Sequence, residues 1–470
     1  MRRKRDTQGW FEFQESNLKV TNEYFAKYGA ISSWLDKTPE ILDLVHRDTR
    51  SALSSVNAAA RRCRARFKYT SEHVLRICIA QVIEGVSLRG IVVRVDDSRS
   101  LRVFTRIYDG PMMDFTTFDR IRNAIQPATW KKINNVLARS AANEGTIDGD
   151  RLRIDTTAVE TNIHYPTDSS LLWDSYRVLA RLIESARDVD RSAVGMRRLH
   201  CKRVKGLHRR IGTITRRGRK PDELKIRYSE LIRSVEGICE WASDLSGKLA
   251  RRARSGRYGA ERSGWAESLA EELDRYQGLA RRVVSQTRQR VIEDRSVANK
   301  DKLLSVFEPH TELIKRGKAG KFFEYGHMIQ VQQVDGCFIT DYEVFSKKPN
   351  ESLLLPAAIE SHKRLFGAPP AELAADRGYW PGKDALDDIE DEVELVSVGK
   401  NGRPNGHDRQ READPLFRHA QRFRAGVEGT ISFLKRVLGL ARCFNKGWRN
   451  YVSTIGASLF AHNLLVLARC

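Results

Sequence analysis

Several signatures of common enzyme classes are missing from this 470-residue sequence. It contains no GxxxxGK[ST] loop for nucleotide phosphates, no HExxH helix for a catalytic zinc ion, and no G-x-S-x-G turn for a serine nucleophile. No internal repeat at a fixed period is visible either. We therefore expect neither a P-loop enzyme, a zinc protease, an α/β-hydrolase nor a solenoid.

The sequence also lacks clear signs of a disulfide framework, a signal peptide or a membrane-spanning helix. The seven cysteines lie far apart, form no CxxC pair and are odd in number, which argues against a disulfide framework or a zinc ribbon. The first ten residues, MRRKRDTQGW, are basic but lack the apolar run of a signal peptide. Residues 451–470 are the most apolar segment, but Ser453, His462 and Asn463 interrupt it, so we expect a packed amphipathic helix. These features predict a cytoplasmic protein without a membrane partner.

What the chain does have is an excess of positive charge. Lysine and arginine number 82 against 60 acidic residues, which gives a net charge of +22. Residues 191–300 hold 28 basic and 13 acidic residues, so 28 − 13 = +15 of this excess lies in one block. A charge-rich helical segment is usually a solvated surface. Because the sign here is so one-sided, we favour a surface that follows the phosphates of nucleic acid.

The N-terminal part of the chain, residues 1–148, has the pattern of helices. The segment TSEHVLRICIAQVIEGVSLRGIVVRV predicts two helices separated at Gly85–Ser87. This arrangement fits a DNA-binding helix pair and fits any helical bundle equally well. Two more helices are expected at 116–125 and 127–143, the second with Pro127 in its first turn.

Strand patterns then follow, interrupted by a long helical segment. RLRIDTTAVET, residues 151–161, predicts the first strand, and residues 171–300 are almost entirely helix-forming. Beyond them the chain predicts a hairpin at Asp335–Gly336, a helix restarting near Pro356, and further strands and helices in alternation. Residues 399–415 have no aliphatic side chain larger than alanine and are expected to form a loop.

This order of elements predicts an α+β fold with a mixed sheet covered by helices. We expect three parts: a helical N-terminal region at 1–148, for which DNA binding is one of the two possibilities given above, a mixed-sheet core at 149–170 and 301–470, and a basic helical insertion at 171–300. The insertion separates the first and second strands of the core.

Three acidic residues are candidates for a metal site. Asp155 interrupts the apolar run of the first strand, and Asp376 ends a short apolar strand just before a glycine turn. Glu428 lies on the helix FRAGVEGTISFLKR, about 40° around the axis from Arg424 and beside the apolar stripe. Alternative explanations are a solvent-facing strand residue, a turn aspartate and an i,i+4 ion pair with Arg424. Carboxylates that converge from rigid elements suit two-metal cleavage of phosphate esters.

Taken together, these segments resemble the DDE transposases of bacterial insertion sequences, most closely the ISNCY-type group. The resemblance is carried by RIDTTAVETNIHYPTDSSLLWDS, the EYGH strand, AADRGYW and FRAGVEGTISFLKR, and it extends over most of the chain. It implies an RNase H-like catalytic core in which Asp155, Asp376 and Glu428 bind two Mg²⁺ ions, for which Mn²⁺ can substitute. It also implies metal-dependent cleavage at the ends of the element and 3′-OH strand transfer into target DNA.

The resemblance further implies roles for two basic residues. Related transposases carry a Tyr, Arg, Glu, Lys signature, of which Arg424, Glu428 and Lys435 are present, whereas Gln421 stands at the tyrosine position. Arg424 and Lys435 would then contact DNA. The implied partners are double-stranded DNA, comprising terminal inverted repeats and target, and further copies of the chain, at least as a dimer, near the bacterial nucleoid. Two alternatives stay open: an RNase H-like DNA nuclease without strand transfer, and a catalytically inactive DNA-binding derivative.

Overall fold

A computed structural model describes residues 17–62, 67–218, 221–318 and 321–469. The basic segment MRRKRDTQGW at the N-terminus lies outside the described residues. Contacts divide the chain into two compact units, residues 1–161 with 326–470, and residues 162–325. The first unit therefore joins the N-terminal helices to the predicted core, and the second extends beyond the predicted insertion at both ends. Each unit is described by itself below.

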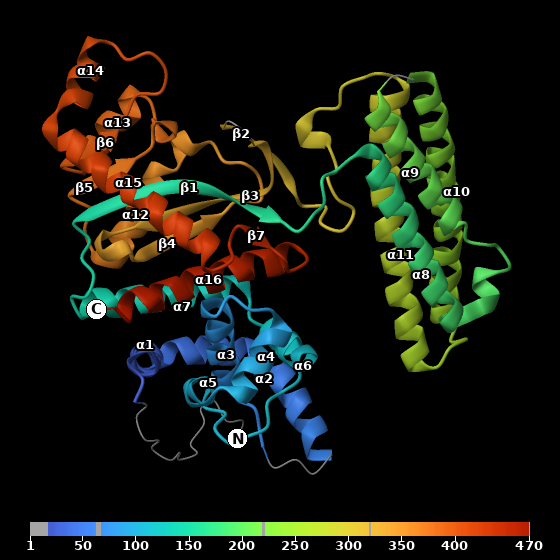
Figure 1. The fold of residues 1–470 in the computed structure, drawn as a ribbon, viewed down its shortest axis with the longest axis horizontal. Helices are drawn as coiled ribbons and strands as arrows, with labels where there is room; N and C mark the ends of the chain where they lie inside the picture. The colour runs from blue at the N-terminus through green and yellow to red at the C-terminus, as the bar shows by residue number, and fades with distance from the viewer. Residues whose placement is uncertain (1–16, 63–66, 219–220, 319–320, 470) are drawn as a thin grey trace. The chain divides into compact units, whose positions relative to one another are not determined.

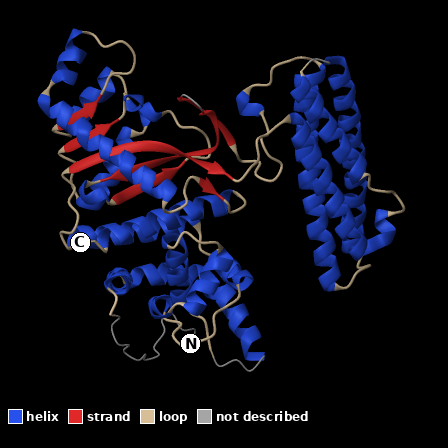
Figure 2. Cartoon of the chain, viewed as in Figure 1, coloured by secondary structure: helices blue, strands red, loops and turns tan. Residues whose placement is uncertain are grey.

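In the described residues, seven strands form one mixed sheet. Figure 2 draws the strands in red. Their bounds are β1 Arg151–Thr161, β2 Glu312–Lys318, β3 Lys321–Gln333, β4 Ile339–Val344, β5 Glu372–Ala375, β6 Leu395–Val398 and β7 Arg442–Cys443. The order is β2-β3-β1-β5-β6, with β4 paired to β3 and β7 to β1. Strand β3 is antiparallel to both β1 and β4, whereas β5 and β7 are parallel to β1 and β6 is parallel to β5. The predicted α+β class with a mixed sheet is confirmed; β2 and β7 were not predicted.

Seven helices form the described residues of the N-terminal part. Their bounds are α1 Lys19–Lys37, α2 Pro39–Arg62, α3 Ser71–Ile83, α4 Leu88–Asp97, α5 Arg99–Thr105, α6 Phe115–Arg122 and α7 Pro127–Asn143. The predicted helix pair is α3 and α4, separated by Gly85 at a positive φ of 60°. Thr70 caps α3 and Ser87 caps α4 through side-chain acceptors. These helices share one apolar core with the C-terminal helix α16, Trp448–Leu467.

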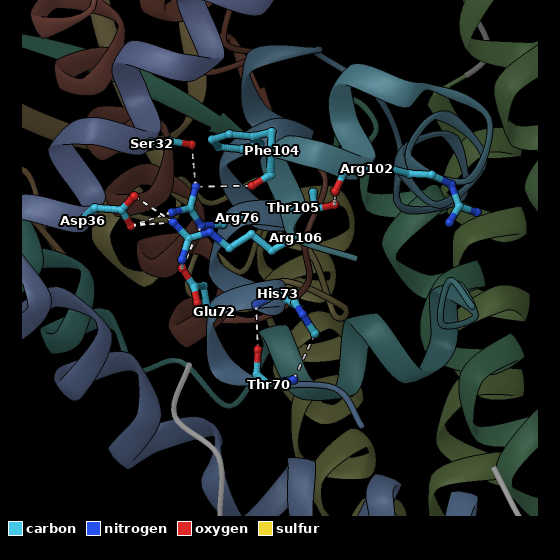
Figure 3. A network of polar contacts seen from close by, with 10 residues as sticks. All are labelled: Ser32, Asp36, Thr70, Glu72, His73, Arg76, Arg102, Phe104, Thr105 and Arg106. Atoms are coloured by element: carbon cyan, nitrogen blue, oxygen red, sulfur yellow. Dashed lines mark hydrogen bonds and ion pairs between the residues drawn. The ribbon is translucent and has the colours of Figure 1, made fainter. Parts of the chain in front are cut away.

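A buried ion network stabilises the N-terminal helices (Figure 3). Arg76 on α3 is 1% exposed, and its guanidinium donates to Glu72 at 3.1 Å and to Asp36 at 3.0 Å. Arg106, which follows α5, pairs with the same two carboxylates. Because two cations and two carboxylates balance, no member of the network is an uncompensated buried charge.

Four long helices build the second unit: α8 Asp168–Val194, α9 Cys201–Arg217, α10 Pro221–Arg254 and α11 Ala260–Thr287. They bury an apolar core of their own, which includes Leu179, Ile183, Leu231, Val235 and Leu245. These helices lie between β1 and β3, in the part of the chain where the sequence predicts a helical insertion. A unit with its own core has the main physical requirement for folding independently.

The last third of the chain places helices on both faces of the sheet. Their bounds are α12 Leu355–Phe366, α13 Lys383–Glu390, α14 Gly406–Ala413 and α15 Pro415–Arg436. Helix α12 begins beside Pro356, as expected, after a 3-10 turn at Glu351–Leu353. The prediction of an uninterrupted loop at 399–415 was wrong, because α14 lies within it. Helix α14 buries no residue and depends on a capping box between Asn405 and Asp408.

The C-terminal apolar segment forms α16, which is buried on most of its surface, with Tyr451, Ile455, Leu459 and Leu464 in the core. Among the described residues, no helix combines the length and apolar character that a membrane crossing requires.

Candidate active site

Asp155 lies within strand β1, next to the point where the parallel strand β5 ends and is followed by Asp376. The β1–β5 register pairs Leu152 with Leu373 and ends with Ile154 opposite Ala375. The next residue in β1 is Asp155, and the residue that follows β5 is Asp376. Because the paired residues Ile154 and Ala375 lie side by side, the two acidic residues that follow them are brought to the same place. The structure thus joins residues that are more than two hundred positions apart in the sequence.

The Asp155 carboxylate is poorly solvated and has few compensating partners. Its side chain is 17% exposed, and burial raises its pKa to about 6, with the nearby charges of Asp376 and Glu351 acting in the same direction. The Thr156 backbone N–H donates to Asp155 Oδ1 at 2.7 Å, and Arg424 attracts the other oxygen; both effects lower the pKa. The result is a carboxylate with a high affinity for a proton or a further cation.

Helix α15 lies across the sheet over β1, β5 and β6 (Figure 1). Its buried residues are Phe417, Ala420, Val427, Thr430 and Leu434, while Ile431 is only half-buried. The apolar stripe expected from the sequence therefore fixes the helix to the sheet, with Thr430 as an additional buried member.

Polar contacts set the position of α15 along the strands. Gln421 Nε2 donates to the Ser397 carbonyl at 2.7 Å and to the Ala375 carbonyl at 3.2 Å, so it ties α15 to the ends of both β5 and β6. Arg153 on β1 donates to the Phe423 carbonyl at 2.7 Å. A Cβ on Gly426 would lie 2.2 Å from Arg153 Nη1, so glycine allows this close approach. The residue that departs from the transposase signature, Gln421, thus has a clear positioning role.

Arg424 lies between the candidate acids. Its Nη1 is 3.8 Å from Asp155 Oδ2, and its Nη2 is 3.5 Å from Glu428 Oε1. The Glu428 side chain is 69% exposed, so it stands at the rim of the site and is linked to Asp155 through the guanidinium. Lys435 is half-buried about two turns further along α15. The structure therefore brings Asp155, Asp376 and Arg424 together and leaves Glu428 one side chain away.

A fourth acidic residue, which the sequence did not single out, belongs to this region. Glu351 begins the 3-10 turn before α12 and accepts a hydrogen bond from the Thr156 hydroxyl. Tyr379 is buried, with 1% exposure. Burial raises the pKa of its hydroxyl well above the ordinary value, and the negative charges of Asp155 and Glu351 raise it further. From sequence alone Glu351 is an acid in a polar connection, and no spacing distinguishes it from a helix-capping residue.

The donor set suits a hard divalent cation. Asp155 and Asp376 offer carboxylate oxygens, which Mg²⁺ and Mn²⁺ prefer, and the pKa of Asp155 is raised mainly by burial, which disfavours its charged form. Within the described ranges, no three His, Cys, Asp or Glu side chains are already grouped closely enough to hold one ion. Glu428 and Arg424 would therefore have to rearrange for Glu428 to join the two aspartates.

Comparison with protein-family models, with curated proteins and with solved structures found no match. The assignment of a site consequently depends on the geometry and chemistry of the chain itself.

The second unit carries a strongly basic helix face. Helix α9 contains no acidic residue, and within the described residues none of its basic side chains forms an ion pair. These exposed side chains are Lys202, Arg203, Lys205, Arg209, Arg210, Arg216 and Arg217. At 100° per residue they cover about 160° of the helix, while Val204, Leu207 and Ile211 bury the opposite side. Such a face can follow a nucleic-acid backbone through its phosphates.

Proposed function

We propose that this protein is a DDE transposase that cleaves the ends of an insertion sequence and joins the freed 3′-OH to target DNA. The observation that carries the proposal is the pair Asp155 and Asp376, which follow the last paired residues of the parallel strands β1 and β5 and lie beneath a helix that presents Arg424 and Glu428. A site of clustered carboxylates beside cationic side chains suits phosphodiester chemistry.

The sheet topology supports an RNase H-like core. Three antiparallel strands, β1, β3 and β4, are followed by β5 and β6, which run parallel to β1. The helical unit is inserted between β1 and β3, where the resemblance to the ISNCY-type group expects an insertion. We therefore take Asp155 as the acid of the first core strand and Asp376 as the acid of the fourth.

Asp155 and Asp376 would hold the divalent ions, and Glu428 would join them after turning from the rim. When bound, the ions activate the attacking oxygen and stabilise the leaving oxygen of an in-line displacement. The carboxylates position these ions, and Arg424 and Lys435 would neutralise phosphate oxygens beside the scissile bond. No serine or tyrosine nucleophile is required, because water and then the DNA 3′-OH attack phosphorus directly.

DNA binding by the second unit completes the proposal. The seven basic side chains of α9 would contact the backbone of the terminal inverted repeats. Because two ends must be brought together, at least a dimer is expected to act on them.

The decisive experiment is cleavage of DNA that carries the inverted repeats flanking the coding region. With Mg²⁺ or Mn²⁺, the wild-type chain should nick the repeat ends and give joined products on a plasmid target. Asp155→Ala and Asp376→Ala should each abolish both products, whereas Asp388→Asn, an exposed change on α13, should abolish neither. Full cleavage by Asp155→Ala would refute the assignment, and cleavage without joining would identify a nuclease.

The exposed position of Glu428 favours one other candidate, a DNA-binding derivative that has lost catalysis. That protein would bind the repeats in a salt-dependent way but would show no affinity for Mn²⁺ by calorimetry. Detectable Mn²⁺ binding that Asp155→Ala removes would exclude it.

A further inference from the structure

The open edge of β1 is approached by carboxylates from both faces of the sheet. Strand β5 pairs with β1 only as far as Ile154, and β7 begins to pair at Glu160. In the described part of the sheet, the β1 edge between these two points has no strand beside it. Asp155 and Thr156 are consecutive strand residues, so their side chains leave the strand on opposite faces at this opening.

Glu351 occupies the face opposite α15. Its Oε1 accepts from the Thr156 hydroxyl, and the 3-10 turn that carries it packs against the turn Arg377–Tyr379 that follows Asp376. Gly378 makes this packing possible, because a Cβ there would lie 2.6 Å from Glu351 Oε2. Glu351 is therefore held beside both candidate aspartates by contacts on two sides.

Two buried polar groups lie beside this opening. The Tyr379 hydroxyl lies next to the side chains of Gln330 and Thr156, but within the described residues neither this hydroxyl nor the Gln330 amide nitrogen makes a hydrogen bond of ordinary geometry. Tyr379 also lies close enough to Asp155 and Glu351 for their charges to act on its hydroxyl. Buried polar atoms without partners are costly, and water bound to an ion is one group that can satisfy them.

We propose that Glu351 is a further ligand of the divalent-cation site, binding the ion together with Asp155 from the opposite face of the sheet. The proposal rests on the proposed function, because it places an additional carboxylate in the same site. It adds an acid that the DDE set does not contain and gives the site a ligand that does not depend on the rearrangement of Glu428.

Calorimetric titration of the full chain with Mn²⁺ alone tests this assignment. Glu351→Gln keeps the acceptor for Thr156 and removes the charge, and we expect its affinity for Mn²⁺ to fall at least about tenfold. Glu360→Gln, which changes an exposed acid on α12, is the matched control and should bind as wild type. Thr156→Val separates the two roles of Glu351, because it removes the hydrogen bond and leaves the carboxylate. It should bind Mn²⁺ within about threefold of wild type.

Three results of the Mn²⁺ titrations would each contradict a different part of the proposal. If wild type binds Mn²⁺, Asp155→Ala does not, and Glu351→Gln binds as wild type, the Glu351 assignment is overturned while the proposed function stands. If Thr156→Val weakens binding as much as Glu351→Gln does, Glu351 acts only by positioning β1, and its role as a ligand is refuted. If wild type binds no Mn²⁺, both the proposed function and this inference fail.

Discussion

Replacing Asp155 with asparagine should stabilise the protein above pH 6. The pKa of Asp155 is about 6 in the folded protein, against an ordinary value of 3.8, because burial disfavours the charged carboxylate. The folded state therefore binds this proton more tightly than the unfolded state does, and the free energy of unfolding falls as the pH rises from about 4 to about 6. A pKa difference of one corresponds to about 1.4 kcal/mol of free energy. Ionisation of Asp155 therefore lowers the free energy of unfolding by about 3 kcal/mol in total.

The assay is equilibrium unfolding in urea at a series of pH values, in the presence of a chelator. Asp155→Asn should gain up to about 3 kcal/mol over wild type at pH 8 and little at pH 4, where the wild-type carboxyl is already neutral. The exposed substitution Asp388→Asn should give no comparable difference between the two pH values.

A divalent cation should cancel most of this difference between wild type and Asp155→Asn. Mg²⁺ stabilises only the protein that binds it, by about 2.7 kcal/mol at a concentration of 100 times the dissociation constant. Wild type should therefore recover at pH 8 what Asp155→Asn gained, and the variant should not respond. If Asp155→Asn is no more stable than wild type at pH 8 without cation, the proposed cost of burying this carboxylate is wrong.

Three further changes test other parts of the molecule. Arg76→Met should destabilise the protein by up to about 3–5 kcal/mol in urea unfolding, because the carboxylates of Glu72 and Asp36 would then share one cation of the network, Arg106; a change under 1 kcal/mol would contradict this. Gly326→Ala should cost about 1–3 kcal/mol or more in the same assay, since a Cβ there would lie 1.9 Å from a carbonyl oxygen of β1. In an Arg424→Gln background, the gain from Asp155→Asn at pH 8 should grow, because the guanidinium lowers the Asp155 pKa; an unchanged gain would show that this attraction is negligible.

Periodicity was enough to predict most of the sheet and the insertion. Alternating residues in RLRIDTTAVET marked β1, and the Asp335–Gly336 turn marked the β3–β4 hairpin. Helix α14 was missed because it has no buried residue, so no apolar period exists to reveal it; its capping residues and ion pairs, such as Lys400 with Asp408, stabilise it instead. Local sequence patterns therefore predict the elements that bury an apolar face. They predict poorly the elements that are stabilised by polar contacts alone.

The candidate site was predictable only in part for a different reason. Asp155 and Asp376 could be singled out because each follows apolar strand residues, whereas the parallel pairing of β1 with β5 that brings them together is a tertiary feature. The side chain of Glu428 was not predictable, because a long side chain at the edge of a helix can turn inward or outward. Its direction here depends on Arg424, which already lies against Asp155. Glu351 depends on a tertiary contact with Thr156, which no local pattern announces.

The position of the helical unit between β1 and β3 has a consequence for synthesis of the chain. The two strands are hydrogen-bonded neighbours, with Glu160 opposite Gly326, yet the whole unit 162–325 must be translated between them. At about 5–20 residues per second, β1 would wait on the order of ten to thirty seconds for its partner on the ribosome. During that interval an apolar strand has both edges unpaired, while the bundle behind it can complete its own core. Shortening the bundle would therefore be expected to reduce aggregation of the nascent chain, independently of any effect on DNA binding.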